Sequence, residues 1–68
     1  MKKATVISKA ELKVLNLVAK GLTSENIGQK LEITKSTVQT HRRNMLRKTG
    51  FRNTLQLVGW AVKEGLVK

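Results

Sequence analysis

Helix-start signals recur along this chain of 68 residues and leave room for only short helices between them. Ser8 and Glu11 have the Ser-x-x-Glu spacing of a capping box, in which each side chain accepts a hydrogen bond from the other residue's backbone N–H. Thr23, Thr34 and Asn53 also belong to the residue types that favour the N-cap position, and each precedes a run with helical periodicity. The sequence therefore predicts an all-α fold with four helices, over residues 9–20, 24–31, 35–49 and 54–64.

Each predicted helix has an apolar stripe, and glycine follows three of them. Gly21, Gly50 and Gly65 stand where a left-handed C-terminal cap is expected. The apolar residues at helical spacing are Leu12, Val14, Leu15 and Val18, then Ile27 and Leu31, then Val38, Met45 and Leu46, and finally Leu57, Val58, Ala61 and Val62. Short helices must bury such stripes against one another. We therefore expect one domain over residues 1–68, with residues 1–6 as a flexible tail.

The second and third helices are separated by only three residues, Glu32–Thr34. A connection this short forces a sharp angle between two helices, which is the spacing of a helix-turn-helix.

The charge of the chain is strongly unbalanced. Fourteen Lys and Arg residues against four acidic residues give a formal net charge of +10. Such an excess indicates a polyanionic partner, with nucleic acid the first candidate and an anionic membrane surface the second. No apolar run approaches the ~20 residues that a membrane span needs, and no long apolar stretch follows Met1-Lys2-Lys3. We therefore expect a cytoplasmic protein with no membrane partner.

The third predicted helix and the residues just after it carry a concentration of basic and short polar side chains. The basic residues are Lys35, Arg42, Arg43, Arg47, Lys48 and Arg52, and no acidic residue lies among them. The short polar residues between them are Ser36, Thr37, Gln39, Thr40, His41 and Asn44. Hydroxyl groups can contact phosphates, and amide or guanidinium groups can pair with base edges in the major groove of DNA. A merely solvated helix face is the alternative, but such a face normally mixes Glu with its Lys.

The ordered series of residues along the chain resembles the LuxR/NarL-type (GerE-type) helix-turn-helix domain of bacterial transcription regulators. The resemblance runs from about Ile7 to Leu66. It rests on Ile7-Ser8 with Glu11, Val14-Leu15, Gly21-Leu22-Thr23, Glu25-Asn26-Ile27, Leu31, Ile33-Thr34, Ser36-Thr37-Val38, His41, Met45, Lys48 and Gly50.

This resemblance implies sequence-specific binding of double-stranded DNA by the helix over residues 35–49. It implies base contacts at Gln39, Thr40 and Arg43. Contacts to phosphates are expected at Lys35, Ser36, Thr37, His41, Arg47 and Lys48. Members of the family commonly bind as homodimers through the fourth helix, here Thr54, Leu55, Val58, Trp60 and Ala61. A receiver or ligand-binding domain commonly precedes the DNA-binding domain, although some members stand alone.

Three residues depart from the family pattern. Thr49 stands where Leu is frequent, which predicts a looser core beneath the third helix. Thr54 stands where many members have Arg, which removes one expected polar contact. Glu32 stands in the turn where glycine is frequent, and a positive φ there would be unfavourable for a residue with a side chain.

The remaining candidates for chemistry have simpler interpretations. His41 has no Cys or Asp to complete a usual metal site, so we predict no metal and no cofactor. Glu11 and Glu25 both fall in first turns of helices, where capping and the helix dipole explain them better than catalysis, and no enzyme is expected. Trp60 fits either the core or a subunit interface. The rival functions are a membrane-surface peptide and a module that binds an acidic protein.

Overall fold

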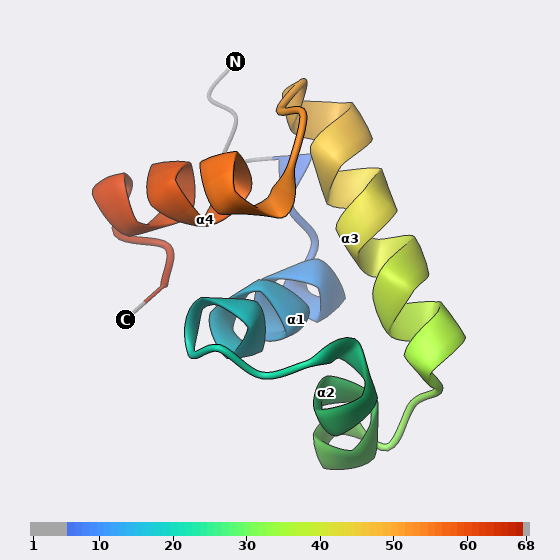
Figure 1. Ribbon diagram of the computed structural model, residues 1–68. Coiled ribbons are helices and arrows are strands. Elements are labelled where there is room, and N and C mark those ends of the chain that lie inside the picture. The colour runs from blue at the N-terminus through green and yellow to red at the C-terminus, as the bar shows by residue number, and fades with distance from the viewer. Residues whose placement is uncertain (1–5, 68) are drawn as a thin grey trace.

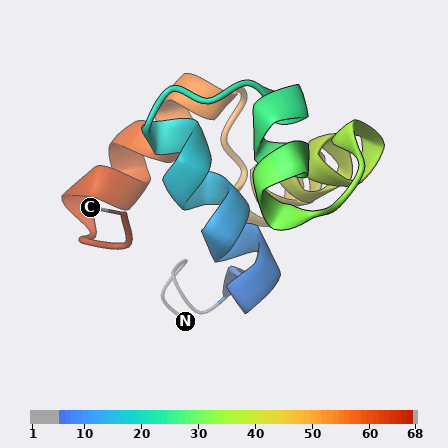
Figure 2. The same ribbon diagram turned by 90° about the horizontal axis from the view of Figure 1, so that it is seen from below.

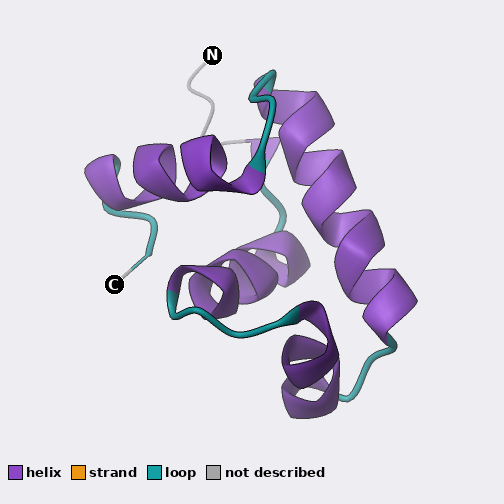
Figure 3. Cartoon of the chain, viewed as in Figure 1, coloured by secondary structure: helices purple, strands orange, loops and turns teal. Residues whose placement is uncertain are grey.

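The computed structural model describes residues 6–67 and contains four α-helices within them. Their bounds are α1 Lys9–Ala19, α2 Ser24–Leu31, α3 Lys35–Thr49 and α4 Thr54–Lys63 (Figure 1, Figure 3). The predicted all-α, four-helix fold is confirmed. α1 and α4 each end one residue earlier than expected, because Lys20 and Glu64 are the C-cap residues. Apart from Val6, the expected tail lies outside the described residues.

The capping residues start the helices as the sequence predicts. The Ser8 hydroxyl accepts from the Glu11 N–H at 3.1 Å, and the Glu11 carboxylate accepts from the Ser8 N–H at 3.0 Å. Thr23, Thr34 and Asn53 accept in the same way from the backbone N–H three residues later. α4 lacks the reciprocal bond of a capping box, because the Gln56 amide oxygen accepts from the N–H of Arg52, one residue before the Asn53 cap.

The helices are arranged around α1, which packs against the other three. Figure 1 shows α3, the longest helix, running along one side of the molecule. Seen from below in Figure 2, α1 lies between α4 on one side and α2 with α3 on the other. α3 therefore lies at the edge of the fold, with one side packed against the other helices and the opposite side uncovered.

One core unites the four helices. Its buried apolar residues are Val14, Leu15, Leu17, Ile27, Val38, Met45, Leu57, Ala61 and Val67. Val62, expected in the inner stripe of α4, is instead 58% exposed, because the buried side of α4 centres on Leu57 and Ala61. Thr49 is buried, and its hydroxyl donates to the Met45 carbonyl at 2.7 Å, so this polar residue is accommodated without an unpaired group.

The connection between α2 and α3 is a tight turn. Glu32 has the left-handed conformation that the sequence suggested, with φ 59°. The Ile33 N–H donates to the Gly28 carbonyl at 2.9 Å and folds the chain back over the end of α2. A Cβ on Gly28 would lie 2.7 Å from the Ile33 carbonyl oxygen, closer than real Cβ contacts allow. This close approach requires glycine at position 28, a requirement that the sequence analysis did not identify.

No helix within residues 6–67 combines the length and the apolar character that crossing a lipid bilayer requires.

Candidate nucleic-acid interface

The free side of α3 carries the three expected base-reading residues. Gln39, Thr40 and Arg43 are all exposed, whereas Val38 and Met45, on the other side of the helix, are fully buried. Because residues three, four and seven apart share a face of a helix, Ser36, Thr40, Arg43 and Arg47 form one outward row with Gln39 beside it. The three side chains predicted to read bases therefore lie on one accessible surface.

The first turn of α3 presents hydroxyl groups beside that row. The Thr34 hydroxyl accepts from the Thr37 N–H at 3.0 Å and lies 2.8 Å from the Thr37 hydroxyl. The Thr40 hydroxyl donates to the Ser36 carbonyl at 3.0 Å. Since its proton is used inside the helix, the Thr40 oxygen is left as a hydrogen-bond acceptor. The exposed Ser36 and Lys35 complete this positive, N-terminal end of the helix.

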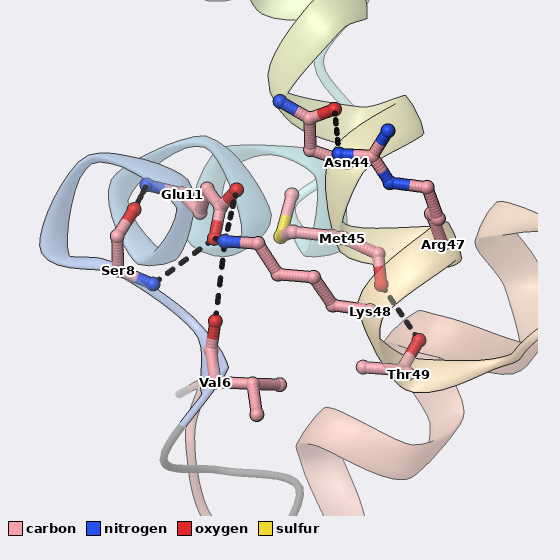
Figure 4. Close-up of polar contacts among 8 residues, drawn as sticks. All are labelled: Val6, Ser8, Glu11, Asn44, Met45, Arg47, Lys48 and Thr49. Carbon is pink, nitrogen blue, oxygen red and sulfur yellow. Dashed lines mark hydrogen bonds and ion pairs between the residues drawn. The ribbon is translucent and has the colours of Figure 1, made fainter.

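Further along the row, Arg47 forms a hydrogen bond with Asn44. The Arg47 guanidinium donates to the Asn44 amide oxygen at 3.3 Å (Figure 4). This bond is a single one, so the remaining N–H groups of this exposed guanidinium stay available to an anion.

His41 lies on the flank of α3 that faces α1. It is half-buried and lines a surface hollow of about 240 Å³ together with Ala10, Lys13, Leu31 and Ile33. Among residues 6–67, no three side chains of the types that bind metals lie together. His41 is therefore beside the expected DNA surface rather than on its outward row.

Lys48 is held by α1, which the sequence analysis did not foresee. Its ammonium group lies 2.8 Å and 3.0 Å from the two carboxylate oxygens of Glu11 and 3.3 Å from the Val6 carbonyl (Figure 4). Glu11 is 3% exposed and also completes the capping box with Ser8. Burial raises the pKa of the Glu11 carboxyl, but the hydrogen bonds from Lys48 and Ser8 more than offset this and hold its pKa below the ordinary 4.5.

The role of Arg42 is not apparent from the sequence, where Arg42 is only one of several basic residues. One guanidinium nitrogen of Arg42 donates to the Ser24 hydroxyl at 2.7 Å, and the other donates to the Thr54 hydroxyl at 3.1 Å. Thr54 therefore takes part in a polar contact with a side chain from α3. No local signal predicts this pairing, because the partners lie 18 and 12 residues away along the chain.

The expected subunit-contact residues of α4 do not share one surface. Leu55 is 82% exposed, whereas Ala61 is fully buried in the core and has no surface to offer a partner. Trp60 is half-buried, and its ring centroid lies 5.7 Å from that of Phe51. The exposed apolar side of α4 runs instead from Leu55 to Val62, which lie seven residues apart and so share a face.

Comparison with known proteins gives a consistent result. Residues 5–61 match the family described as bacterial regulatory proteins, luxR family. The chain is 35% identical over 63 residues to the oxygen regulatory protein NreC of Staphylococcus aureus, here in strains JH9, JH1 and NCTC 8325 / PS 47. These alignments cover 93% of the chain but only 29% of the length of each relative. No solved structure is significantly similar to the chain.

Proposed function

The chain belongs to the luxR family of bacterial regulatory proteins and is a DNA-binding domain of transcription regulation, and from that premise we propose that α3 is its recognition helix in the major groove of duplex DNA. The resemblance found in the sequence is confirmed at the level of the family. The observation that carries the proposal is the outward row of α3, which is exposed, polar and basic, and free of acidic residues. An α-helix fits the width of the major groove, and α2 supports α3 from behind.

Base reading is assigned to Gln39, Thr40 and Arg43. A guanidinium can donate two N–H groups to the O6 and N7 acceptors of guanine, and a glutamine amide can form two hydrogen bonds with N6 and N7 of adenine. The Thr40 oxygen suits a donor such as the amino group of adenine or cytosine, since its own proton is donated to Ser36.

Phosphate contacts are assigned to accessible residues around the three base-reading positions. Ser36 and Arg47 lie on the outward row itself, and Lys35, Thr37 and His41 lie beside it. Lys35 and Arg47 would give affinity through counterion release, and the Ser36, Thr37 and His41 side chains would fix the position of the helix on the backbone. None of these contacts selects a sequence. Lys48, which the family resemblance placed among them, is assigned instead to the ion pair with Glu11.

The domain is proposed to bind as a homodimer through the exposed apolar side of α4, from Leu55 to Val62. The chain spans 29% of the length of the NreC proteins that it matches. We propose that it acts as the DNA-binding output of a bacterial regulator, either joined to a receiver or ligand-binding domain or on its own.

Selection of bound duplexes from a random pool tests the proposal. The wild-type domain should enrich one half-site sequence, and the Arg43→Ala variant should lose ~1–3 kcal/mol of binding free energy and relax the preference at one base position. The exposed Arg52, which lies after α3, provides the matched control: Arg52→Ala should leave the selected sequence unchanged.

Two results would refute the assignment. A pool without any enriched sequence would favour a module for acidic proteins over a DNA reader. An Arg43→Ala variant that selects the wild-type half-site with undiminished discrimination would remove Arg43 from the reading surface.

A further inference from the structure

Arg42 joins three helices at a single point. It projects from the middle of α3, and its two guanidinium nitrogens bind the first residue of α2, Ser24, and the first residue of α4, Thr54. From this geometry we infer that Arg42 is a positioning residue, which fixes the orientation of α3 for sequence-specific binding without contacting DNA itself. The inference rests on the proposed function of α3, and it gives a role in specificity to a residue outside the outward row.

The guanidinium group of Arg42 is chemically suited to connecting α2 and α4 to α3. A guanidinium is planar and rigid, so two donors that bind two fixed acceptors define the direction of the side chain as well as its distance. Ser24 is buried, so its hydroxyl offers the Arg42 donor an acceptor that is largely shielded from water. Lysine, with one flexible ammonium group, cannot reproduce this fork.

The direction of Arg42 separates it from the phosphate contacts. It is half-buried and bound on the side of α3 that faces α2 and α4, whereas Arg43, the next residue, is exposed on the outward row. The backbone of α3 links the two, so a rotation of α3 that breaks the Arg42 contacts also turns the Arg43 side chain in the groove.

The opposite flank of α3 is held by Lys48, which binds Glu11 of α1. Arg42 and Lys48 together fasten α3 to the other three helices. The partners of Arg42 are the neutral hydroxyls of Ser24 and Thr54, whereas the ion pair found within residues 6–67 joins Lys48 to Glu11. The role of Arg42 therefore depends on the geometry of its fork more than on its charge.

Arg42→Lys tests this directly, because it keeps the charge and removes the fork. We expect the Kd for the selected half-site to rise about tenfold, as for the loss of one charge-assisted hydrogen bond, with the Kd for random duplex changing less than about twofold. The slope of log Kd against log salt should stay as in wild type, because no phosphate contact is lost. Binding is measured at a temperature where circular dichroism shows the variant to be folded.

Thr54→Val and Thr54→Ser give the second arm from the acceptor side. Thr54→Val removes one acceptor with little change of shape and should reduce discrimination in the same direction as Arg42→Lys, whereas Thr54→Ser keeps the hydroxyl and should bind as wild type. Arg52→Lys is the matched control, because it makes the same Arg-to-Lys exchange at an exposed residue that does not bind Ser24 or Thr54.

The outcomes separate the two levels of the argument. A wild-type domain that selects no sequence overturns the proposed function and the positioning role together. A selective wild type with unchanged discrimination in Arg42→Lys overturns the positioning role alone. Equal weakening on all duplexes in Arg42→Gln, with a salt slope smaller by about one and recovery in Arg42→Lys, overturns it in favour of a phosphate contact.

Discussion

At the scale of single residues, Glu11 combines a local and a distant interaction. Its carboxylate accepts from the Ser8 N–H within the first turn of α1 and pairs with Lys48 of α3, 37 residues away. The chain has four acidic residues, and the other three, Glu25, Glu32 and Glu64, are exposed. Glu11 is therefore the carboxylate through which acid acts most directly on the fold.

The stability of the domain is expected to fall in acid through Glu11. Because the fold holds the pKa of Glu11 below 4.5, the ionised carboxylate stabilises the fold fully above that value. This contribution is lost as pH falls through the lower pKa of the folded state. Thermal unfolding followed by circular dichroism between neutral and strongly acidic pH measures the effect.

Glu11→Gln should lower the free energy of unfolding by ~1–3 kcal/mol at neutral pH, because it leaves the Lys48 ammonium without its carboxylate. The acid decline should also become shallower in this variant. Glu25→Gln, in the exposed first turn of α2, serves as the control and should keep the wild-type decline. An equally steep decline in Glu11→Gln would assign the acid sensitivity to another group.

Residue roles could be predicted from the sequence where they depend on neighbours along the chain. The cap of Ser8 and the exposure of Gln39, Thr40 and Arg43 follow from spacing and helical periodicity alone. The roles of Arg42 and Lys48 could not be predicted in this way, because basic residues that bind the fold and basic residues left for DNA are alike in sequence. Only tertiary contacts separate them.

At the scale of elements, the turn between α2 and α3 depends on the size of one residue. Gly28 lies inside α2, where glycine is unfavourable for a helix relative to alanine. It is required by the close approach of Ile33, whose carbonyl oxygen leaves no room for a Cβ. Helix propensity and turn packing therefore oppose each other at this position, and packing decides.

Gly28→Ala is predicted to lower the free energy of unfolding. Overpacking costs ~1–3 kcal/mol, which outweighs the gain of up to ~1 kcal/mol from alanine in a helix. Gly59→Ala in α4 is the matched control, since nothing lies within 4 Å of a Cβ there. Urea unfolding should show a lower midpoint for Gly28→Ala and an equal or higher one for Gly59→Ala. A Gly28→Ala midpoint at or above wild type would contradict the packing argument.

The helix boundaries were largely predictable because N-caps and C-terminal glycines act locally. The face that α4 presents was predicted less well. Leu57, Val58, Ala61 and Val62 all fit a broad apolar stripe, and only packing against α1 and α3 decides that Ala61 is buried while Val62 is exposed.

At the scale of the whole molecule, three helices support α3 while α4 leaves an apolar side uncovered. We expect this side to close when two domains bind adjacent half-sites. Leu55→Asp should raise the Kd for paired half-sites about tenfold or more, through the loss of one buried leucine contact. Because Leu55 is 82% exposed, the variant should unfold as wild type and bind a single half-site unchanged.

Gel-shift titrations on single and paired half-sites measure this difference. Leu55→Met keeps the apolar surface and should retain tight binding to the paired site. Equal weakening of Leu55→Asp on both kinds of duplex would place the subunit contact elsewhere.

The two fastenings of α3 also limit how new operator preferences can arise. Replacing the whole of α3 by the helix of another regulator would exchange Arg42 and Lys48 together with the outward row. Ser24 and Glu11 would then lose the partners that they bind here. Exchange confined to positions 36, 39, 40, 43 and 47 would alter the base preference and leave the contacts that hold α3 in place. The anchoring thus divides one helix into positions free to diversify and positions that must change in step with the other three helices.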